Sequence, residues 1–570
     1  MDDDSEWSRP SPRRTPRSLR TRLPELVLVA GIAVQTLVLV SMSRRLWFFG
    51  DDWDFLLTRG TIDGGPDRGL WAPHNEHWST LMVLLFRAIF PFAGLRSYLA
   101  YSIVQIVMHA VVVLLVFSVL RRVGVSRWTS VVTAWSVLFL GVATEALLST
   151  TSMNHTGSTM FALAALRWAM VEDRRRRHLP VLWLLMLLSL MFSATGVPMV
   201  AFVAYYLLFS RGPRAFAVGL SVPVALYLLW YATAGRGEAH DFVSAWDYTR
   251  STEFVWSAVA HAFDGATGLP AGGAVLAVVL VLVPLLGIDR ELRDPRLDTL
   301  CWAGLAGYAS HMILVVALRL SWGFEDALGG RYAYAAFVYL SPALAVCLGV
   351  LARRVVAPLT LLVPLTGLVL LAYALQGAST AHAYYQDLHT FTRVWPDRLL
   401  GAGQAVDAGQ EPLTQSTGDW GGPTITADLV TSPEIRDALP DRLPSGKGRV
   451  DAESMFFVGV GPDSYDLAAP TAMLGWSGFG SPLDASSGCR AYDTAGSLEF
   501  SLDVDEGGSE VRLEADELTS VRTRIERFGV ESWTRDWSVD SDEVVIGSTA
   551  AASTLIVQVE GTGPVRICVP

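Results

Sequence analysis

Acidic and histidine side chains gather between residues 48 and 78, directly after the first long apolar stretch. The segment FFGDDWDFLL carries Asp51, Asp52 and Asp54 among bulky apolar residues. A carboxylate at a membrane edge can accept a proton from a sugar hydroxyl or bind a divalent cation through oxygen. Capping of a short helix in a solvated loop is the simpler alternative. Asp51 or Asp52 is therefore the candidate catalytic base, and we expect Asp54 to hold the loop.

The motif HNEHW follows in the same predicted loop. Its polar residues are His74, Asn75, Glu76 and His77. Hydrogen bonding to a sugar or phosphate is the favoured interpretation, and interfacial anchoring by Trp71 and Trp78 is the alternative. Together with Asp52, His77 could also bind a divalent cation such as Mg, Mn or Ca, but two imidazoles and one carboxylate are a weak indication of zinc.

Further charged candidates stand at the ends of later apolar stretches. Glu145 lies in an otherwise apolar segment, where a carboxylate is costly unless paired or hydrated, and His155 follows it. Arg319 and Arg331 offer planar, permanently charged groups suited to a phosphate. Snorkelling toward lipid head groups is the alternative for either arginine alone. Because GGRY leads straight into an apolar stretch, Arg331 is the favoured ligand-facing residue.

The composition excludes a soluble globule. The 570 residues are 51% hydrophobic and 17% charged, with a mean hydropathy of +0.36, which predicts a polytopic α-helical membrane protein. Residues 376–570 carry 30 Asp and Glu against 13 Lys and Arg, a net charge of −17, whereas the rest of the chain is at +6. An acidic module is thus joined to a basic-flanked membrane region. Nothing in this distribution indicates nucleic-acid binding.

Apolar length and basic clusters together predict a topology. About 20 apolar residues cross a bilayer, and short cytoplasmic loops collect Arg and Lys. Residues 79–95, which contain Arg87 and Pro91, fit better as an amphipathic helix on the outer surface. The amino terminus is then cytoplasmic and the acidic module extracytoplasmic. The eleven predicted spans are 24–42, 97–119, 128–147, 157–171, 180–194, 196–210, 215–233, 271–288, 298–318, 333–351 and 355–375.

Three regions follow from this topology. Residues 1–23 form a disordered basic tail, 24–375 a transmembrane domain, and 376–570 an outer acidic domain. From residue 454 onward, stretches such as SLEFSLDV and STLIVQVE read as short strands separated by turns, which predicts a β-sandwich-like, mostly-β fold. Outside the cytoplasm, Cys489 and Cys568 are expected to form a disulfide.

The motifs DDW, HNEHW, SATGVP and GRYAY and the Glu145 segment, with this layout, resemble a group of actinobacterial membrane proteins. More broadly, residues 24–375 resemble the GT-C superfamily of polyprenyl-phosphate-dependent glycosyltransferases. The resemblance implies that Asp51 or Asp52 deprotonates an acceptor hydroxyl, which attacks the anomeric carbon with inversion. It also implies that Arg331, with Arg319 or a metal, stabilises the departing phosphate.

The resemblance places the sugar or acceptor near the remaining candidates, which are His74, Asn75, Glu76, His77, Glu145 and His155. Its implied partners are the lipid bilayer, a polyprenyl-phosphate sugar, and a cell-envelope glycan, glycolipid or protein acceptor. The outer domain would take part in carbohydrate binding during cell-wall biogenesis. Two alternatives remain: a lipid-linked sugar transporter or flippase, and a catalytically silent glycan-binding assembly protein. Few charges lie within the spans, which favours chemistry at the surface over transport.

Overall fold

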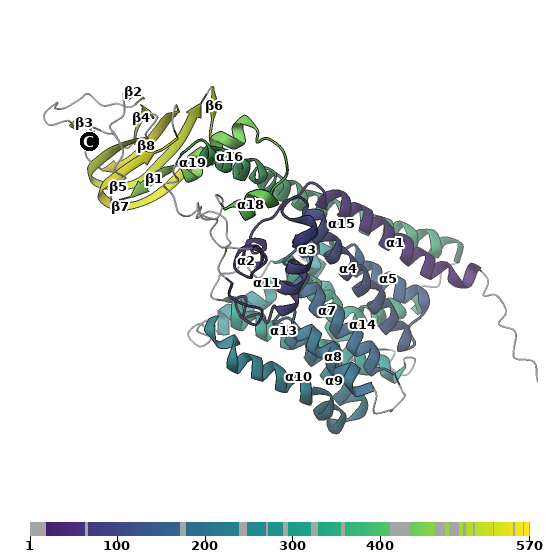
Figure 1. Cartoon of the computed structure of the whole chain (residues 1–570). Helices are drawn as coiled ribbons and strands as arrows, with labels where there is room; N and C mark the ends of the chain where they lie inside the picture. The colour runs from purple at the N-terminus through teal and green to yellow at the C-terminus, as the bar shows by residue number, and fades with distance from the viewer. Residues whose placement is uncertain are drawn as a thin grey trace, which may run out of the picture. The chain divides into compact units, whose positions relative to one another are not determined.

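The computed structural model forms two compact units (Figure 1). The first comprises Met1–Val40, Pro73–Ser79 and Val104–Ala383, and the second Ser41–Ala72, Thr80–Ile103 and Tyr384–Pro570. The predicted tail 1–23 and the connection 319–332, between the predicted spans 298–318 and 333–351, fall largely outside the described residues. The structure describes residues 19–62, 67–171, 178–238, 248–268, 272–288, 294–320, 329–354, 359–410, 432–461, 473–477, 489–493, 497–504, 508–527, 529–550, 553–562 and 564–568.

The first unit is a helical bundle whose elements follow the predicted apolar stretches. Each predicted span has a helix at its place, except that 128–147 is divided at a bend. The helices are α1 (Leu19–Ser43), α4 (Tyr98–Arg122), α5 (Arg127–Leu138), η1 (Gly141–Ala143), α6 (Thr144–Leu148), α7 (Met153–Ala169), α8 (His178–Leu190), α9 (Gly196–Arg211), α10 (Pro213–Thr233), η2 (Gly235–Glu238), α11 (Tyr248–Thr267), α12 (Gly272–Leu285), α13 (Pro295–Arg319), α14 (Gly330–Arg354) and α15 (Leu359–Thr392).

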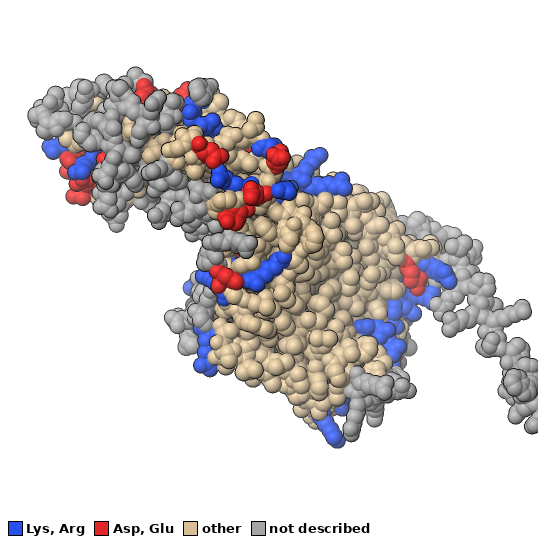
Figure 2. All heavy atoms as spheres, in the orientation of Figure 1, with Lys and Arg blue, Asp and Glu red and all other residues tan. Residues whose placement is uncertain are grey.

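The surface of the bundle is that of a membrane protein. Among the described residues, five helices are long and apolar enough to cross a membrane, or up to seven if each of two bent helix pairs counts as one span. Large apolar side chains such as Leu37, Leu228 and Leu286 are exposed. The face of the bundle in Figure 2 carries little charge. Because so extensive an apolar surface is stable only against lipid, the chain is a multi-pass membrane protein.

A sharp bend separates α5 from η1 and α6. The two parts differ in direction by 46°. The chain passes very close to α15 here, since a Cβ on Gly377 would lie 2.1 Å from the carbonyl oxygen of Phe139. It also passes close to the start of α14, because a Cβ on Gly330 would lie 2.2 Å from the carbonyl oxygen of Val142. These glycines allow α6 to bring Glu145 beside the first residues of α14.

The helices α13 and α14 pack with their backbones in close approach. A Cβ on Gly304 of α13 would lie 2.3 Å from the carbonyl oxygen of Tyr339 in α14. Because α14 returns along α13 after a short connection, the last residue of α13, Arg319, and the second residue of α14, Arg331, occupy the same end of the pair. The basic residues that sequence analysis singled out are thereby gathered at one level of the bundle.

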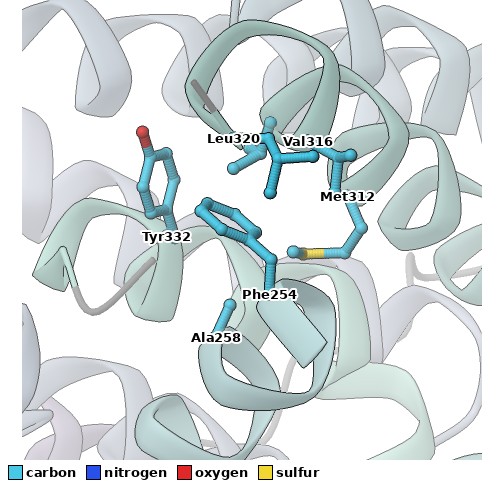
Figure 3. Close-up of a cluster of buried hydrophobic side chains, with 7 residues drawn as sticks. Phe254, Ala258, Met312, Val316, Leu320 and Tyr332 are labelled. Atoms are coloured by element: carbon cyan, nitrogen blue, oxygen red, sulfur yellow. The ribbon is translucent and has the colours of Figure 1, made fainter. Parts of the chain in front are cut away.

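The amphipathic helix α11 is absent from the sequence prediction. Its apolar residues recur on one face rather than in one run, so it does not resemble a membrane span. Phe254 and Ala258 insert between α13 and α14, as Figure 3 shows. Their partners are Met312, Val315, Val316, Leu320 and Tyr332. The helix therefore covers the end of the α13–α14 pair near the two arginines.

The second unit begins with the loop that follows α1. It contains α2 (Asp52–Leu57) and α3 (Thr80–Ala93), the latter at the position of the predicted surface helix. The rings of Phe55 and Phe86 stack with centroids 5.3 Å apart and join the two helices. Arg59 is fully buried, and its guanidinium lies 3.4 Å from the Asp54 carboxylate. Asp54 thus holds the loop together, as its sequence position suggested.

The rest of the second unit consists of short helices followed by an antiparallel sheet. Among the described residues, three helices precede the strands: α16 (Trp395–Asp407), α18 (Pro433–Ala438) and α19 (Gly446–Phe456). Helix α19 packs on β1, β5 and β6. The strands are β1 (Val458–Gly461), β2 (Met473–Ser477), β3 (Cys489–Asp493), β4 (Ser497–Asp503), β5 (Ser509–Arg527), β6 (Val530–Glu531), β7 (Arg535–Ser548), β8 (Thr554–Thr562) and β9 (Pro564–Cys568).

These described strands form one antiparallel sheet rather than the two sheets of a sandwich. Its order is β1-β7-β5-β8-β4-β2, with β9 pairing β5 and β3, and β6 pairing β5. The long strand β5 changes register near Glu514 and Leu518, so its first part pairs with β9 and its second with β8. Such irregularities bend a strand, and the continuous sheet is curved (Figure 1).

Two further features concern the predicted domain limits. The structure pairs Cys489 with Cys568, the two cysteines expected to form a disulfide, across the β3–β9 ladder. The predicted boundary between residues 375 and 376 falls inside α15, which continues to Thr392. The polar residues after 375 continue the helical hydrogen bonding even though they are too polar for a membrane span, so the change in composition marks a change of surroundings and not the end of the helix.

Candidate functional site

The HNEHW motif forms a tight turn in the first unit. The amide of His74 donates to the carbonyl oxygen of His77 at 3.0 Å, and the amide of His77 returns a bond of 2.9 Å. Asn75 has a φ of 51°, a left-handed conformation that asparagine tolerates better than most residues. The left-handed backbone conformation in this turn is therefore a sufficient reason for an asparagine at position 75. Its proposed contact with a sugar stays a prediction.

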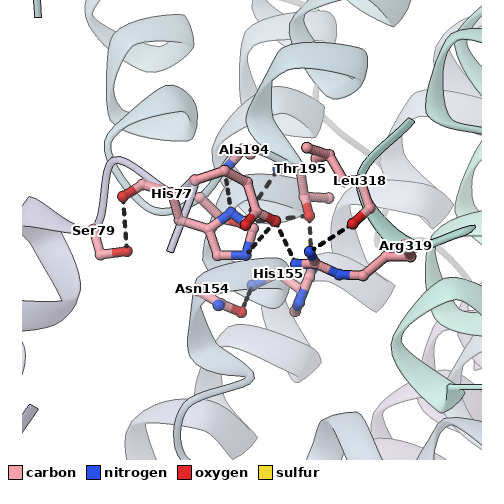
Figure 4. Close-up of polar contacts among 10 residues, drawn as sticks. His77, Ser79, Asn154, His155, Ala194, Thr195, Leu318 and Arg319 are labelled. Carbon is pink, nitrogen blue, oxygen red and sulfur yellow. Dashed lines mark hydrogen bonds and ion pairs between the residues drawn. The ribbon is translucent and has the colours of Figure 1, made fainter. Parts of the chain in front are cut away.

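Glu76 and His77 meet Arg319 beside this turn. Glu76 Oε1 accepts a hydrogen bond from Arg319 Nη2, and His77 Nε2 lies 3.5 Å from the same oxygen. The amide of Ala194 donates to His77 Nδ1 at 3.3 Å. Because that amide can only donate, Nδ1 accepts and the proton of neutral His77 lies on Nε2, directed at the carboxylate. One oxygen of Glu76 is thus shared by the adjacent His77 and by Arg319, which lies 243 residues further along the chain (Figure 4).

His155 and Thr195 extend the cluster. His155 Nδ1 lies 2.7 Å from Thr195 Oγ1, and the rings of His77 and His155 are 6.2 Å apart. Thr195 lies in the break between α8 and α9, where its amide also bonds Ser193 Oγ at 3.2 Å. Sequence analysis quoted this SATG segment as part of the resemblance but assigned none of its residues to the site. A hydroxyl-rich interruption between two apolar stretches was the signal for it.

Burial and neighbouring charges determine the protonation of Glu76 and His77. Burial alone would raise the pKa of Glu76, but the charges of protonated His77 and of Arg319, with hydrogen bonds, outweigh it and lower the pKa. Burial lowers the pKa of His77 to about 4, against the opposing charge of Glu76. The positive charges of Arg319, His74 and Arg331 act in the same direction as burial and contribute to this lowered pKa. At neutral pH the site therefore holds an ionised glutamate and a neutral histidine.

Glu145 and Arg331 form a second pair at the start of α14. Arg331 Nη1 lies 3.1 Å from Glu145 Oε1, and the amide of Gly330 donates to Glu145 Oε2 at 2.6 Å. The side chains of Glu145 and Arg331 are 28% and 26% exposed, so this pair is more accessible than that of Glu76 and Arg319. The charge of Arg331 also lowers the pKa of His77, so the two pairs interact electrostatically. The sequence-predicted residues Glu76, His77, Glu145, His155, Arg319 and Arg331 are therefore brought together.

The candidate bases, Asp51 and Asp52, belong to the second unit. Asp51 precedes α2 and is exposed, whereas Asp52 is fully buried. Asp52 Oδ2 accepts a hydrogen bond of 3.1 Å from the amide of Phe49. Of the two carboxylates, Asp51 is thus the one presented at the surface of its own unit.

The side chains of the described residues give little support to the predicted cation site. Within the described residues, no group of three or more His, Cys, Asp and Glu side chains is placed to hold a metal. His77 accepts at Nδ1 and carries its proton on Nε2, so neither ring nitrogen presents a lone pair to a cation. Binding of a divalent cation at Asp52 and His77 stays a prediction, and the chemistry below uses the side chains of the chain alone.

Fold and site together define a multi-pass helical membrane protein with a buried polar cluster and a carboxyl-terminal β-rich domain. No protein-family model matches the chain, and no curated protein is significantly similar in sequence. Among solved structures, the chain is similar to ArnT from Cupriavidus metallidurans bound to undecaprenyl phosphate. The TM-score is 0.41 and the identity 13%, over 77% of this chain and 94% of that chain. At this level of likeness, the function must be argued from the site itself.

Proposed function

We propose that the protein is an inverting glycosyltransferase that moves a sugar from a polyprenyl-phosphate donor to a cell-envelope glycan, glycolipid or protein. The observation that carries the proposal is the polar site at one end of the α13–α14 pair. Arg331, whose side chain is partly exposed at the start of α14, is suited to a phosphate. The ionised Glu76 would repel a phosphate and is already paired with Arg319, so this part of the site suits an uncharged part of the ligand.

The reaction takes place at the outer face of the membrane in this proposal. Basic clusters in the alternate loops put the amino terminus inside, and a disulfide between Cys489 and Cys568 suits a domain outside the reducing cytoplasm. A donor whose lipid chain lies in the bilayer presents its anomeric carbon near the membrane surface. No soluble nucleotide sugar is then required outside the cell.

Asp51 is the proposed base, because it is exposed whereas Asp52 is buried. It takes the proton of the acceptor hydroxyl, whose oxygen bonds to the anomeric carbon as the bond from that carbon to the phosphate oxygen breaks. Attack opposite the leaving phosphate inverts the configuration. The bonding electrons remain on the phosphate, whose charge grows by one, and Arg331 stabilises that charge in the transition state.

The test is sugar transfer by the full chain in nanodiscs, with undecaprenyl-phosphoryl mannose, glucose and arabinofuranose as donors. Asp51→Asn is expected to lower kcat by about a hundredfold or more, since a positioned base contributes that much. Arg331→Ala is expected to lower kcat/KM by a similar factor. Asp437→Asn on the surface of the second unit and Arg354→Ala at the far end of α14 are the matched controls.

Three outcomes would contradict parts of this proposal. Transfer that survives with both Asp51 and Asp52 replaced by Asn would exclude a base in this loop. Donor binding without any transfer would favour a glycan-binding assembly protein. Movement of the donor across the bilayer, measured in proteoliposomes without an acceptor, would favour a flippase.

A further inference from the structure

The two carboxylate oxygens of Glu76 have different surroundings. Oε1 is shared by Arg319 and by His77 Nε2. Oε2 is buried and has no hydrogen-bond partner among the residues that the structure describes. The side chain as a whole is only 8% exposed. Buried polar atoms in native proteins nearly always have a partner, so an ionised oxygen in this position indicates a missing one.

The chemistry of the site restricts what the missing partner can be. A carboxylate oxygen only accepts, so the partner must donate a hydrogen bond. A phosphate oxygen would be repelled, and the positive charges of Arg319 and Arg331, which both act on neighbouring His77, disfavour an ammonium group. A neutral hydroxyl satisfies the oxygen without adding charge.

We propose that Glu76 binds a hydroxyl of the donor sugar through Oε2, while Arg319 and His77 fix the carboxylate through Oε1. The proposal rests on the glycosyltransferase function above and identifies the part of the site that recognises the sugar. Arg319 and His77 are then positioning residues. The amide of Ala194, which donates to His77 Nδ1, ties this arrangement to the break between α8 and α9.

This assignment divides the site into two parts. Arg331 faces the phosphate end of the donor, and Glu76 faces the sugar. Bare polyprenyl phosphate would therefore use only the first part, whereas a sugar-bearing lipid would use both. Because the bare phosphate also carries one more negative charge, the contribution of the Glu76 part is measured by the effect of a Glu76 substitution on each lipid separately.

The experiment measures binding of two probes to the full chain in nanodiscs. One probe is undecaprenyl phosphate, and the other is whichever of undecaprenyl-phosphoryl mannose, glucose or arabinofuranose binds wild type most tightly. In Glu76→Gln, the amide oxygen stays with Arg319 and the NH2 group turns to the ligand, so the charge-assisted acceptor is lost. The sugar-bearing probe should bind about tenfold more weakly, and the bare phosphate within about threefold of wild type. Glu253→Gln, on the exposed face of α11, is the control.

Deoxy analogues of the sugar supply a second measurement that needs only wild-type protein to fold. Removing one particular hydroxyl should weaken binding to wild type about tenfold, and should have little further effect in Glu76→Gln. His77→Asn should weaken the binding of the sugar-bearing probe alone, because the Glu76 carboxylate is still present but is no longer fixed by the His77 ring.

The outcomes separate this inference from the proposed function. Equal losses for both probes in Glu76→Gln, or no loss for either, would overturn the assignment. A deoxy analogue series in which every analogue loses as much affinity in Glu76→Gln as in wild type would overturn it too. Wild type that binds none of these lipids would overturn the proposed function as well.

Discussion

Acidification from pH 7 to pH 4 is expected to destabilise the first unit through His77. The ring is 10% exposed and lies against the Ala194 amide on one side and Glu76 on the other. Burial lowers the pKa of His77 to about 4 from an ordinary value of 6.5. Protonation at Nδ1 would set two donors against each other, because the Ala194 amide already points at that nitrogen.

The direction of the stability change depends on whether the folded or the unfolded state binds the proton more readily. An unfolded His77 takes up a proton as the pH falls through 6.5, whereas the folded one stays neutral until the pH approaches 4. The unfolded state therefore gains free energy from protonation in this window, and the folded state does not. A pKa that changes from 6.5 to about 4 corresponds to a loss of about 3 kcal/mol of stability between those pH values.

The measurement is equilibrium unfolding of the full chain in mixed micelles at several pH values between 7.5 and 4. His77→Asn keeps an acceptor for the Ala194 amide and does not titrate. It should be less stable than wild type at pH 7, and the gap should narrow by about 3 kcal/mol toward pH 4. His382→Asn, at an exposed position of α15, should follow the wild-type curve. A constant gap between wild type and His77→Asn across the whole range would refute the buried, neutral assignment.

Two further predictions concern the second unit. Asp54→Ala removes the carboxylate beside the buried guanidinium of Arg59, and should destabilise the loop by about 3 kcal/mol. Hydrogen exchange of residues 51–62 measures this change, and protection equal to wild type would contradict it. Reduction of the bond between Cys489 and Cys568, which closes a separation of 79 residues, should destabilise the β domain by about 4 kcal/mol. Unfolding followed with and without reductant tests it; Cys489→Ser is the control that should no longer respond, and a wild-type curve unchanged by reductant would count against the prediction.

The helical part of the fold was largely accessible from the sequence because lipid imposes a simple rule on it. Apolar runs of span length mark the positions of α1, α4, α10, α13 and α14 within a few residues. The rule fails where a helix does not face lipid on all sides. Helix α11 buries Phe254 and Ala258 on one face only and so lacks a continuous apolar run. The bend between α5 and α6 depends on close backbone contacts with Gly330 and Gly377, which lie far away in the sequence.

The β domain shows a different limit. Alternation of buried and exposed residues identifies strands such as β4 and β8, but it does not determine which strands are neighbours. One long strand, β5, pairs with four others and joins them in a single sheet. A sandwich and a curved single sheet have the same alternation, so the sequence pattern could not distinguish them.

The candidate site was found residue by residue but not as an arrangement. Histidines, acids and arginines in apolar surroundings are conspicuous, and Glu76, His77, Glu145, Arg319 and Arg331 were all singled out. Their pairing was not, because Glu76 and Arg319 are separated by 243 residues, and Glu145 and Arg331 by 186. Sequence analysis did not assign Thr195 and Ala194 to the site, because they contribute a hydroxyl and a backbone amide, which no side-chain pattern marks.

The geometry also distinguishes the two arginines; sequence analysis favoured Arg331 as the ligand-facing residue and gave Arg319 as a possible second phosphate ligand. The guanidinium of Arg319 is 9% exposed and bonded to a glutamate whose pKa is lowered. Removing that carboxylate from Arg319 would leave a buried cation with one charged partner fewer, which is strongly unfavourable. Arg331 is three times as exposed, and its carboxylate partner is also held by the amide of Gly330. A phosphate can therefore join Arg331 at a lower electrostatic penalty, which favours Arg331 as the phosphate ligand and leaves Arg319 to orient Glu76.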